Sequence, residues 1–238
     1  MSNKSGAIVI FIKTPGFSPV KTRLAKSIGK IPAETFHTLA AQATEAVVQD
    51  CVHKSEGGIT PYFAVAEEKA LNHPLWEKFT VISQGEGEVG DRLFKVYNEL
   101  REKHRFVILV GADCPQMNVD HLAEAIQICD EAEQFVLGPC DDGGFFLFGG
   151  SKALPRELWQ AIPYSSGQST KVLNLLVKNM GTIKTMRPLF DVDTIDDLHK
   201  LEFEFASTLH HLGRDSLLPA QHLVLNWVKS VTSKNDHL

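Results

Sequence analysis

The sequence predicts a three-layer α/β/α fold whose central sheet is mostly parallel and partly mixed. Segments with strand-like and helix-like patterns alternate through most of the 238 residues. Residues 106–111, Phe-Val-Ile-Leu-Val-Gly, form an apolar, β-branched run typical of a strand buried on both faces of a sheet. Two later strand-like segments, 134–138 and 144–149, are joined by so short a connection that we expect them to be antiparallel.

In the first half of the chain, strands are expected where apolar runs are bounded by turn residues, at 7–12, 59–66 and 81–82. Helices are expected where apolar residues recur every three or four positions, from about residue 21 and over 33–52, 73–79 and 90–104. Residues 13–19 contain too much proline and glycine for regular structure, so they form a loop after the first strand.

In the second half, the same patterns predict helices over 119–132 and 169–180 and an extended segment over 182–187. Thr194 is a natural N-cap, because Asp196 and Asp197 follow in the positive first turn of a helix. A last amphipathic helix covers 216–231, and the final seven residues are expected to fray. Its apolar face is expected to pack on the sheet, with dimerisation as the alternative.

Composition narrows the class of protein. Apolar residues make up 43% and charged residues 22%, as in ordinary globular proteins. A net charge of −5 without a basic tail argues against a nucleic-acid partner. With no linker or repeat, we expect one domain over 1–238, with a C-terminal helical extension from about residue 203.

The four cysteines include no Cys-x-x-Cys pair, so neither a zinc knuckle nor a redox motif is indicated. The amino-terminal residues lack the apolar core and cleavage site of a signal peptide. No apolar run reaches the length of about 18 residues that a membrane span needs. We therefore expect a cytoplasmic protein with no membrane partner.

An aspartate follows the predicted central strand: Asp113 comes two residues after Gly111, and Pro115 stops the strand. Ligands of open α/β sheets bind beyond the carboxyl ends of the strands, so Asp113 is the first candidate metal ligand. Asp191 and Asp193 follow the last strand and are further candidates, although either could instead cap the next helix. Mg²⁺ prefers one or two carboxylates together with phosphate oxygens and water.

Four cations follow the first strand within fourteen residues, at Lys13, Lys21, Arg23 and Lys26. Arginine grips phosphate oxygens through two hydrogen bonds and lysine acts as a point charge, so the segment predicts a phosphate site. The alternative is a solvated basic loop. Neither a P-loop signature nor a Gly-x-Gly-x-x-Gly follows the strand, which disfavours an ordinary ATPase or a dinucleotide enzyme.

Two glycine-rich segments are candidates for close contact with a ligand, because glycine lets the backbone approach it. The first, residues 84–92, is a candidate for nucleotide binding through Gln84, Gly85, Gly87 and Arg92, or is only a turn. The second, Asp142-Gly143-Gly144, is suited to an acceptor pocket. No Ser/His/Asp or Cys/His arrangement for nucleophilic catalysis stands out in the sequence.

Five motifs in order resemble the nucleotide-diphospho-sugar transferase superfamily, which has the GT-A fold. Within it, the chain is similar to an uncharacterised bacterial transferase family that itself resembles 2-phospholactate guanylyltransferase and, more distantly, the molybdenum-cofactor guanylyltransferases. The motifs span roughly residues 7–200 and are Lys13–Phe17 with Val20–Lys26, Gln84–Gly87 with Gly90–Leu93, Gly111–Pro115, Gly138–Phe146 and Asp191–Thr194.

The resemblance implies a nucleotide over the carboxyl edge of the sheet. Lys21, Arg23 and Lys26 would hold phosphates, and Asp113, helped by Asp191 or Asp193, would hold Mg²⁺ or Mn²⁺. Lys21, Arg23 and Asp113 are the candidate catalytic residues, and the partners would be a nucleotide or nucleotide sugar and a small acceptor. A homodimer is a further expectation.

Two reactions fit the resemblance. One is nucleotidyl transfer from a nucleoside triphosphate to a small phosphorylated acceptor, and the other is glycosyl transfer from a nucleotide-diphospho-sugar. Many glycosyltransferases carry Asp-x-Asp at the metal position, whereas Asp113 is followed by Cys114-Pro115, which favours nucleotidyl transfer. Sugar nucleotidyltransferases carry a glycine-rich loop after the first strand, whereas only Gly16 is present here, which favours the other reaction. A non-catalytic nucleotide-binding or scaffold protein is the third alternative.

Overall fold

The structure is a computed structural model that describes residues 4–164 and 166–235. One sheet has the strand order β3-β2-β1-β4-β6-β5-β7. Its strands are β1 (Gly6–Ile12), β2 (Ile59–Val65), β3 (Thr80–Ser83), β4 (Val107–Gly111), β5 (Gln134–Pro139), β6 (Phe145–Gly150) and β7 (Thr182–Thr185). Strand β6 is antiparallel to both β4 and β5, whereas the other paired strands are parallel. The expected α/β fold with a mostly parallel, partly mixed sheet is confirmed.

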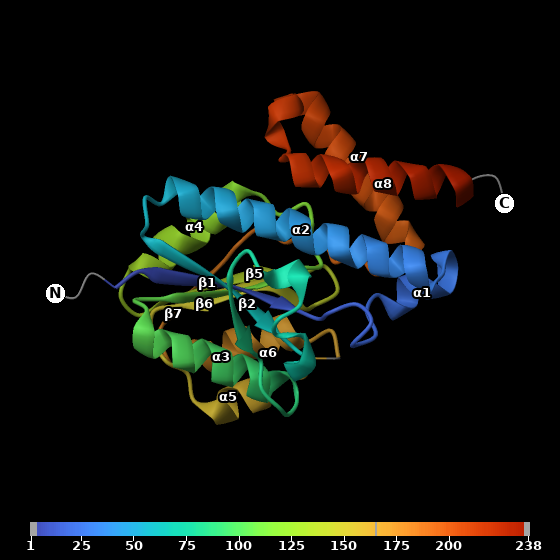
Figure 1. Cartoon of the computed structure of the whole chain (residues 1–238). Helices are drawn as coiled ribbons and strands as arrows, with labels where there is room; N and C mark the ends of the chain where they lie inside the picture. Colours follow the sequence, from blue (N-terminus) through green and yellow to red (C-terminus); the bar gives the residue numbers. More distant parts are fainter. Residues whose placement is uncertain (1–3, 165, 236–238) are drawn as a thin grey trace.

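Helices cover both faces of this sheet (Figure 1). The α-helices are α1 (Thr22–Ile28), α2 (Lys30–Lys54), α3 (Val89–Lys103), α4 (Val119–Asp130), α5 (Arg156–Gln160), α6 (Ser169–Val177), α7 (Ile195–Leu212) and α8 (Pro219–Asn235). Helices α2 and α4 lie on one face, and α3, α5 and α6 on the other. In the described part of the chain, no helix combines the length and apolarity needed to cross a bilayer.

The alternating side chains of the strands build two cores, one on each face, because successive residues of a strand point to opposite sides. On β1, Ile8 and Ile10 pack with the apolar sides of α2 and α4. Their neighbours Ala7 and Val9 pack instead with α3, α5 and α6. Strand β1 is therefore apolar at every position, which explains why its sequence is a continuous hydrophobic run.

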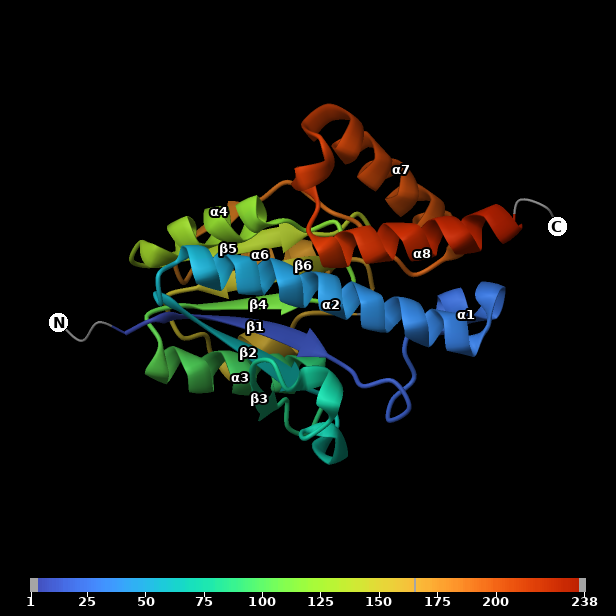
Figure 2. The ribbon, with the colours of Figure 1, turned by 45° about the horizontal axis from the view of Figure 1, so that its top comes forward.

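The strand order places a ligand crevice between β1 and β4. From β1 the chain moves to β2 and β3 on one side, and then returns to β4 on the other side of β1. Figure 2 shows the carboxyl ends of β1 and β4 side by side, below the middle of α2. Crevices of open α/β sheets form at such a reversal of strand order. The loop after β1 and the residues after β4 therefore meet at one edge.

The carboxyl-terminal helices correct two sequence expectations. The apolar face of α8 packs on α2 and α7 rather than on the sheet, because α2 already covers that face of the sheet (Figure 1). Phe36 of α2, Phe205 of α7 and Val228 of α8 are buried together in a third core. Residues 232–235 continue α8 instead of fraying, and 236–238 lie outside the described residues.

A further expectation is corrected in the first half of the chain. The helix expected over 73–79 is only a 3₁₀ turn at Pro74–Trp76.

Candidate functional site

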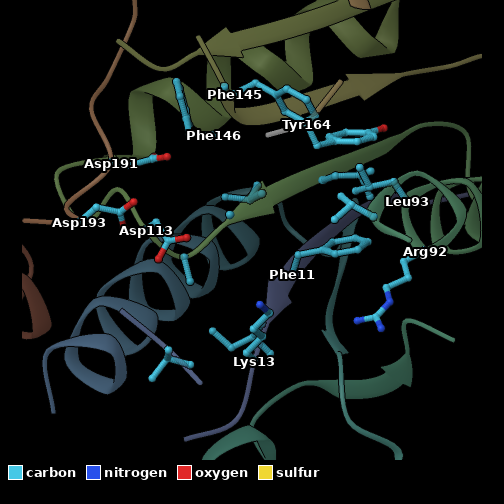
Figure 3. A pocket seen from close by; sticks show the side chains of 18 of the residues that line it. Phe11, Lys13, Arg92, Leu93, Asp113, Phe145, Phe146, Tyr164, Asp191 and Asp193 are labelled. Carbon is cyan, nitrogen blue, oxygen red and sulfur yellow. The ribbon is translucent and has the colours of Figure 1, made fainter. Parts of the chain in front are cut away.

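A cavity of about 770 Å³ opens at the carboxyl edge of the sheet (Figure 3). Many of the residues singled out from the sequence line it: Lys13, Lys21, Arg23, Gln84, Gly87, Arg92, Asp113, Asp142, Gly144, Asp191 and Asp193. Lys26, Gly85 and Gly143 are not part of the lining. The strand order therefore brings residues separated by up to 180 positions to one cavity.

Lys21 joins the basic segment to two aspartates. Its Nζ lies 2.5 Å from Oδ1 of Asp113, just beyond β4, and 3.0 Å from Oδ1 of Asp193, beyond β7. The Lys21 side chain is only 3% exposed, so this ammonium group is almost fully withdrawn from water. Its backbone has a φ of 46°, the left-handed region, at the N-cap of α1. A non-glycine residue there costs on the order of 1–2 kcal/mol.

Lys21 and Asp113 hold each other in their charged forms. Burial alone would lower the pKa of Lys21, but the nearby carboxylates of Asp113 and Asp193 outweigh it and raise that pKa. The partial loss of water around Asp113 in the cavity wall would by itself raise its pKa, but the Lys21 ammonium outweighs this effect and lowers that pKa. Arg23 adds a second cation, with its Nη1 3.5 Å from Oδ2 of Asp193. Lys21 and Asp113 are therefore both charged at neutral pH.

The acidic residues of this cluster have the chemistry to hold a divalent ion. Oxygens of Asp113 and Asp193 already converge within 3.0 Å of one cation, the Lys21 ammonium. Their side chains are 49% and 35% exposed, so both also face the cavity. Two carboxylates, with the remaining positions left to phosphate oxygens and water, match the preference of Mg²⁺.

Asp191 lies in a different environment from Asp193. Its Oδ1 accepts hydrogen bonds from the thiols of Cys114, at 2.9 Å, and Cys140, at 3.1 Å. Burial raises the pKa of Asp191, and the hydrogen bond from Cys114 only partly opposes this. The helix-capping interpretation of Asp191 and Asp193 is wrong for their side chains, because the Thr194 side chain caps α7, as expected from the sequence.

The two glycine-rich segments have structural contacts of their own. The Gln84 side chain donates hydrogen bonds to the carbonyls of Ile12 and Ala64 and so ties the segment to β1 and β2. Arg92 donates to the carbonyl of Gly87 at 2.9 Å and closes the loop onto α3. In the turn between β5 and β6, the Gly143 backbone has a φ of 85° and lies against the Gly167 carbonyl, a place that a Cβ atom would fill.

The structure adds cavity residues that the sequence did not single out. His37, on α2, contacts the Lys13 carbonyl through Nε2 at 2.9 Å, and burial lowers its pKa although that hydrogen bond opposes the shift. Phe11, Phe145 and Tyr164 line the end of the cavity away from the aspartates (Figure 3). His37 could have been singled out from the sequence, because it lies on the apolar side of the helix expected over 33–52. The aromatic residues lie far apart in the chain and give no local signal.

Comparison with known proteins identifies a sequence family and a shared fold. A family profile described as "Uncharacterized protein conserved in bacteria (DUF2064)" matches residues 38–166, more than half of the chain. No curated protein matches the chain in sequence.

Among solved structures, a protein from Desulfovibrio desulfuricans G20, provisionally described as a nucleotide-diphospho-sugar transferase, has a TM-score of 0.79 and 16% identity over 98% of both chains. A nucleotidyl transferase from Methanothermobacter has a TM-score of 0.56 and 14% identity, over 87% of this chain and 100% of that one. The manganese complex of Rv0371c from Mycobacterium tuberculosis H37Rv has a TM-score of 0.51 and 14% identity, over 83% and 97%. At these identities, the likeness establishes a common fold.

Proposed function

The chain belongs to the bacterial family DUF2064, and from this premise we propose that it is a metal-dependent nucleotidyltransferase. Its substrates would be a nucleoside triphosphate and a small phosphorylated acceptor. The observation that carries the proposal is the Lys21 ammonium, which lies between Asp113 and Asp193 in the wall of a cavity at the carboxyl edge of the sheet. A solved nucleotidyl transferase that shares this fold supports the proposed nucleotidyltransferase activity.

In the proposed reaction, an acceptor oxygen forms a bond to the α-phosphorus of the nucleotide. The bond from that phosphorus to the oxygen bridging to the β-phosphate breaks, and pyrophosphate leaves with the electron pair. Lys21 neutralises charge on the α-phosphate, and the exposed Arg23 and Lys13 hold the outer phosphates at the cavity mouth. The chain needs no covalent nucleophile, because positioning and charge stabilisation suffice for this chemistry.

Asp113 and Asp193 would hold Mg²⁺ or Mn²⁺ beside the phosphates. When bound, such an ion supplies positive charge to the phosphoryl oxygens as a Lewis acid. The manganese complex of a protein with the same fold supports this assignment. Asp191 is less suited to this role, because its carboxylate is engaged by the two thiols.

The remaining cavity divides between base and acceptor. The rings of Phe11, Phe145 and Tyr164 offer flat apolar surfaces to a nucleobase. Asp142 and Gly144, in the turn between β5 and β6, also line the cavity and would contact the acceptor. The cytoplasm stays the expected compartment, since a reducing environment suits the four free thiols among the described residues. A homodimer stays a prediction.

The first test is ligand binding followed by turnover. Nucleoside triphosphates with Mg²⁺ or Mn²⁺ are expected to raise the melting temperature, because a ligand that binds only the folded state stabilises it. Release of pyrophosphate with a panel of phosphorylated acceptors then identifies the reaction. The variant Asp113→Asn, checked for folding by circular dichroism, should lose the metal-dependent part of the shift. An unchanged melting temperature with every nucleotide and metal at millimolar concentration would refute the proposal.

Glycosyl transfer is the second candidate, because the solved structure with the TM-score of 0.79 is provisionally described as a nucleotide-diphospho-sugar transferase. The same assay separates the two reactions. Loss of the sugar from a nucleotide-diphospho-sugar selects glycosyl transfer, whereas pyrophosphate release selects nucleotidyl transfer. Binding of nucleotide without turnover of either kind would point to the non-catalytic alternative.

A further inference from the structure

Two thiols and one carboxylate converge beside the cavity. The Sγ atoms of Cys114 and Cys140 lie 3.8 Å apart, and both thiols donate to Oδ1 of Asp191, at 2.9 and 3.1 Å. The three ligand atoms thus lie within 4.8 Å of one another. They come from three separate segments, after β4, at the end of β5 and after β7.

Backbone hydrogen bonds fix these three segments relative to one another. Val192 donates to the carbonyl of Asp113 at 3.1 Å, which ties the segment after β7 to the segment after β4. Asp141 donates to the carbonyl of Leu189 at 3.0 Å, which ties it to the end of β5. The convergence of the side chains is therefore built into the backbone and does not depend on the thiol hydrogen bonds alone.

We propose that Cys114, Cys140 and Asp191 form a binding site for a zinc-type divalent cation, separate from the phosphate-facing ion of Asp113 and Asp193. Zinc binds thiolate sulfur at about 2.3 Å in tetrahedral geometry, which places two sulfurs about 3.8 Å apart. The observed separation of the Cys114 and Cys140 sulfurs is 3.8 Å. A tetrahedral site needs about 3.5 Å between sulfur and carboxylate oxygen, so the Asp191 carboxylate moves back by roughly half an ångström.

Binding is an exchange of protons for the ion. Both thiols lose their protons to solvent, and the two thiolates and the carboxylate bind the cation. Magnesium is a poor occupant, because it prefers oxygen ligands, whereas two sulfurs select zinc-like ions. Three protein ligands leave a fourth position for water or an oxygen of a molecule in the cavity that Asp191 lines.

The experiment uses the full chain, stripped of metal with a chelator, kept reduced with a phosphine, and titrated with Co²⁺ as a coloured substitute for zinc. We expect about one equivalent to give the near-ultraviolet band of thiolate-to-cobalt charge transfer, and Zn²⁺ to abolish it. Cys140→Ser and Cys114→Ser should each lose most of the band. Asp191→Asn should weaken binding at least tenfold. The matched control is Cys51→Ser, another buried cysteine but one outside this cluster, which should keep the band.

The readout needs no nucleotide and no activity, so its outcome is independent of the proposed transferase reaction. Absence of the band in the folded, reduced wild-type protein overturns the proposal, and so does a band that persists in Cys140→Ser. If Cys114→Ser does not fold, Cys140→Ser and native mass spectrometry with Zn²⁺ still decide the question. We expect one tightly held ion in the wild-type protein and none in Cys140→Ser.

Discussion

Lys21 is the residue whose replacement should affect function most. In Lys21→Met, the apolar stem is retained but Asp113 and Asp193 lose the cation between them. We expect kcat/KM for pyrophosphate release to fall roughly 100- to 1,000-fold, as when one charge-stabilising donor is removed from an active site. Lys26→Met is the control, because Lys26 is exposed on the same helix and does not line the cavity. Activity of Lys21→Met within a few fold of Lys26→Met would contradict the assigned role.

Single residues at strand ends were predictable, and residues brought together by the strand order were not. Asp113 stood out because it follows a buried run, and the structure does place it beside Lys21. The contact of Cys140 with Asp191 joins positions 51 residues apart across β5 and β7, so no local spacing reveals it. The lack of a Cys-x-x-Cys pair in the sequence therefore excludes only metal-binding motifs whose cysteines are closely spaced.

At the level of elements, the start of α7 positions Asp193. The Asp197 carboxylate accepts from the backbone N–H groups of Asp193, at 3.0 Å, and Thr194, at 2.8 Å, and so closes the capping box. In Asp197→Ala, we expect a loss of about 1 kcal/mol in the free energy of unfolding, typical of a lost cap. We also expect a higher KM for the nucleotide, because Asp193 loses its anchor.

Urea denaturation and steady-state kinetics measure both effects of Asp197→Ala. The control is Asp196→Ala, an exposed residue in the same first turn, which removes a charge from the helix start without breaking the box. Equal destabilisation by the two substitutions would mean that the macrodipole, rather than the capping box, accounts for the effect.

Elements with long periodic patterns could be predicted from the sequence. Very short elements could not, and neither could the layer of the fold against which a helix packs. The helix expected over 33–52 is α2, and the antiparallel strand expected over 144–149 is β6. The five-residue helix α5 is too short to show a period of 3.6 residues. The apolar face of α8 was real, but amphipathicity does not say which layer it meets, and a helix rather than the sheet covers it.

For the molecule as a whole, buried histidines predict a stability that falls as the solution becomes acidic. Burial lowers the pKa values of His37, His104 and His121 from their ordinary value of 6.5. Below about pH 6.5 the unfolded chain therefore binds protons that the folded chain does not, and the free energy of unfolding decreases as pH falls. Each such histidine contributes a slope of at most about 1.4 kcal/mol per pH unit.

Urea denaturation between pH 7.5 and 5.5 measures this slope, and comparison of variants isolates one residue. In His37→Gln, the side-chain amide can still donate to the Lys13 carbonyl, as the neutral imidazole does, but it cannot take up a proton. We therefore expect a shallower slope in His37→Gln and the wild-type slope in His211→Gln, a change at an exposed position on α7. Asp191, whose pKa is raised by burial, acts in the opposite sense but equally in every variant. An identical slope in wild type and His37→Gln would show that the pKa of His37 is the same in the folded and unfolded protein, and would contradict the lowering of that pKa by burial against the loop that follows β1.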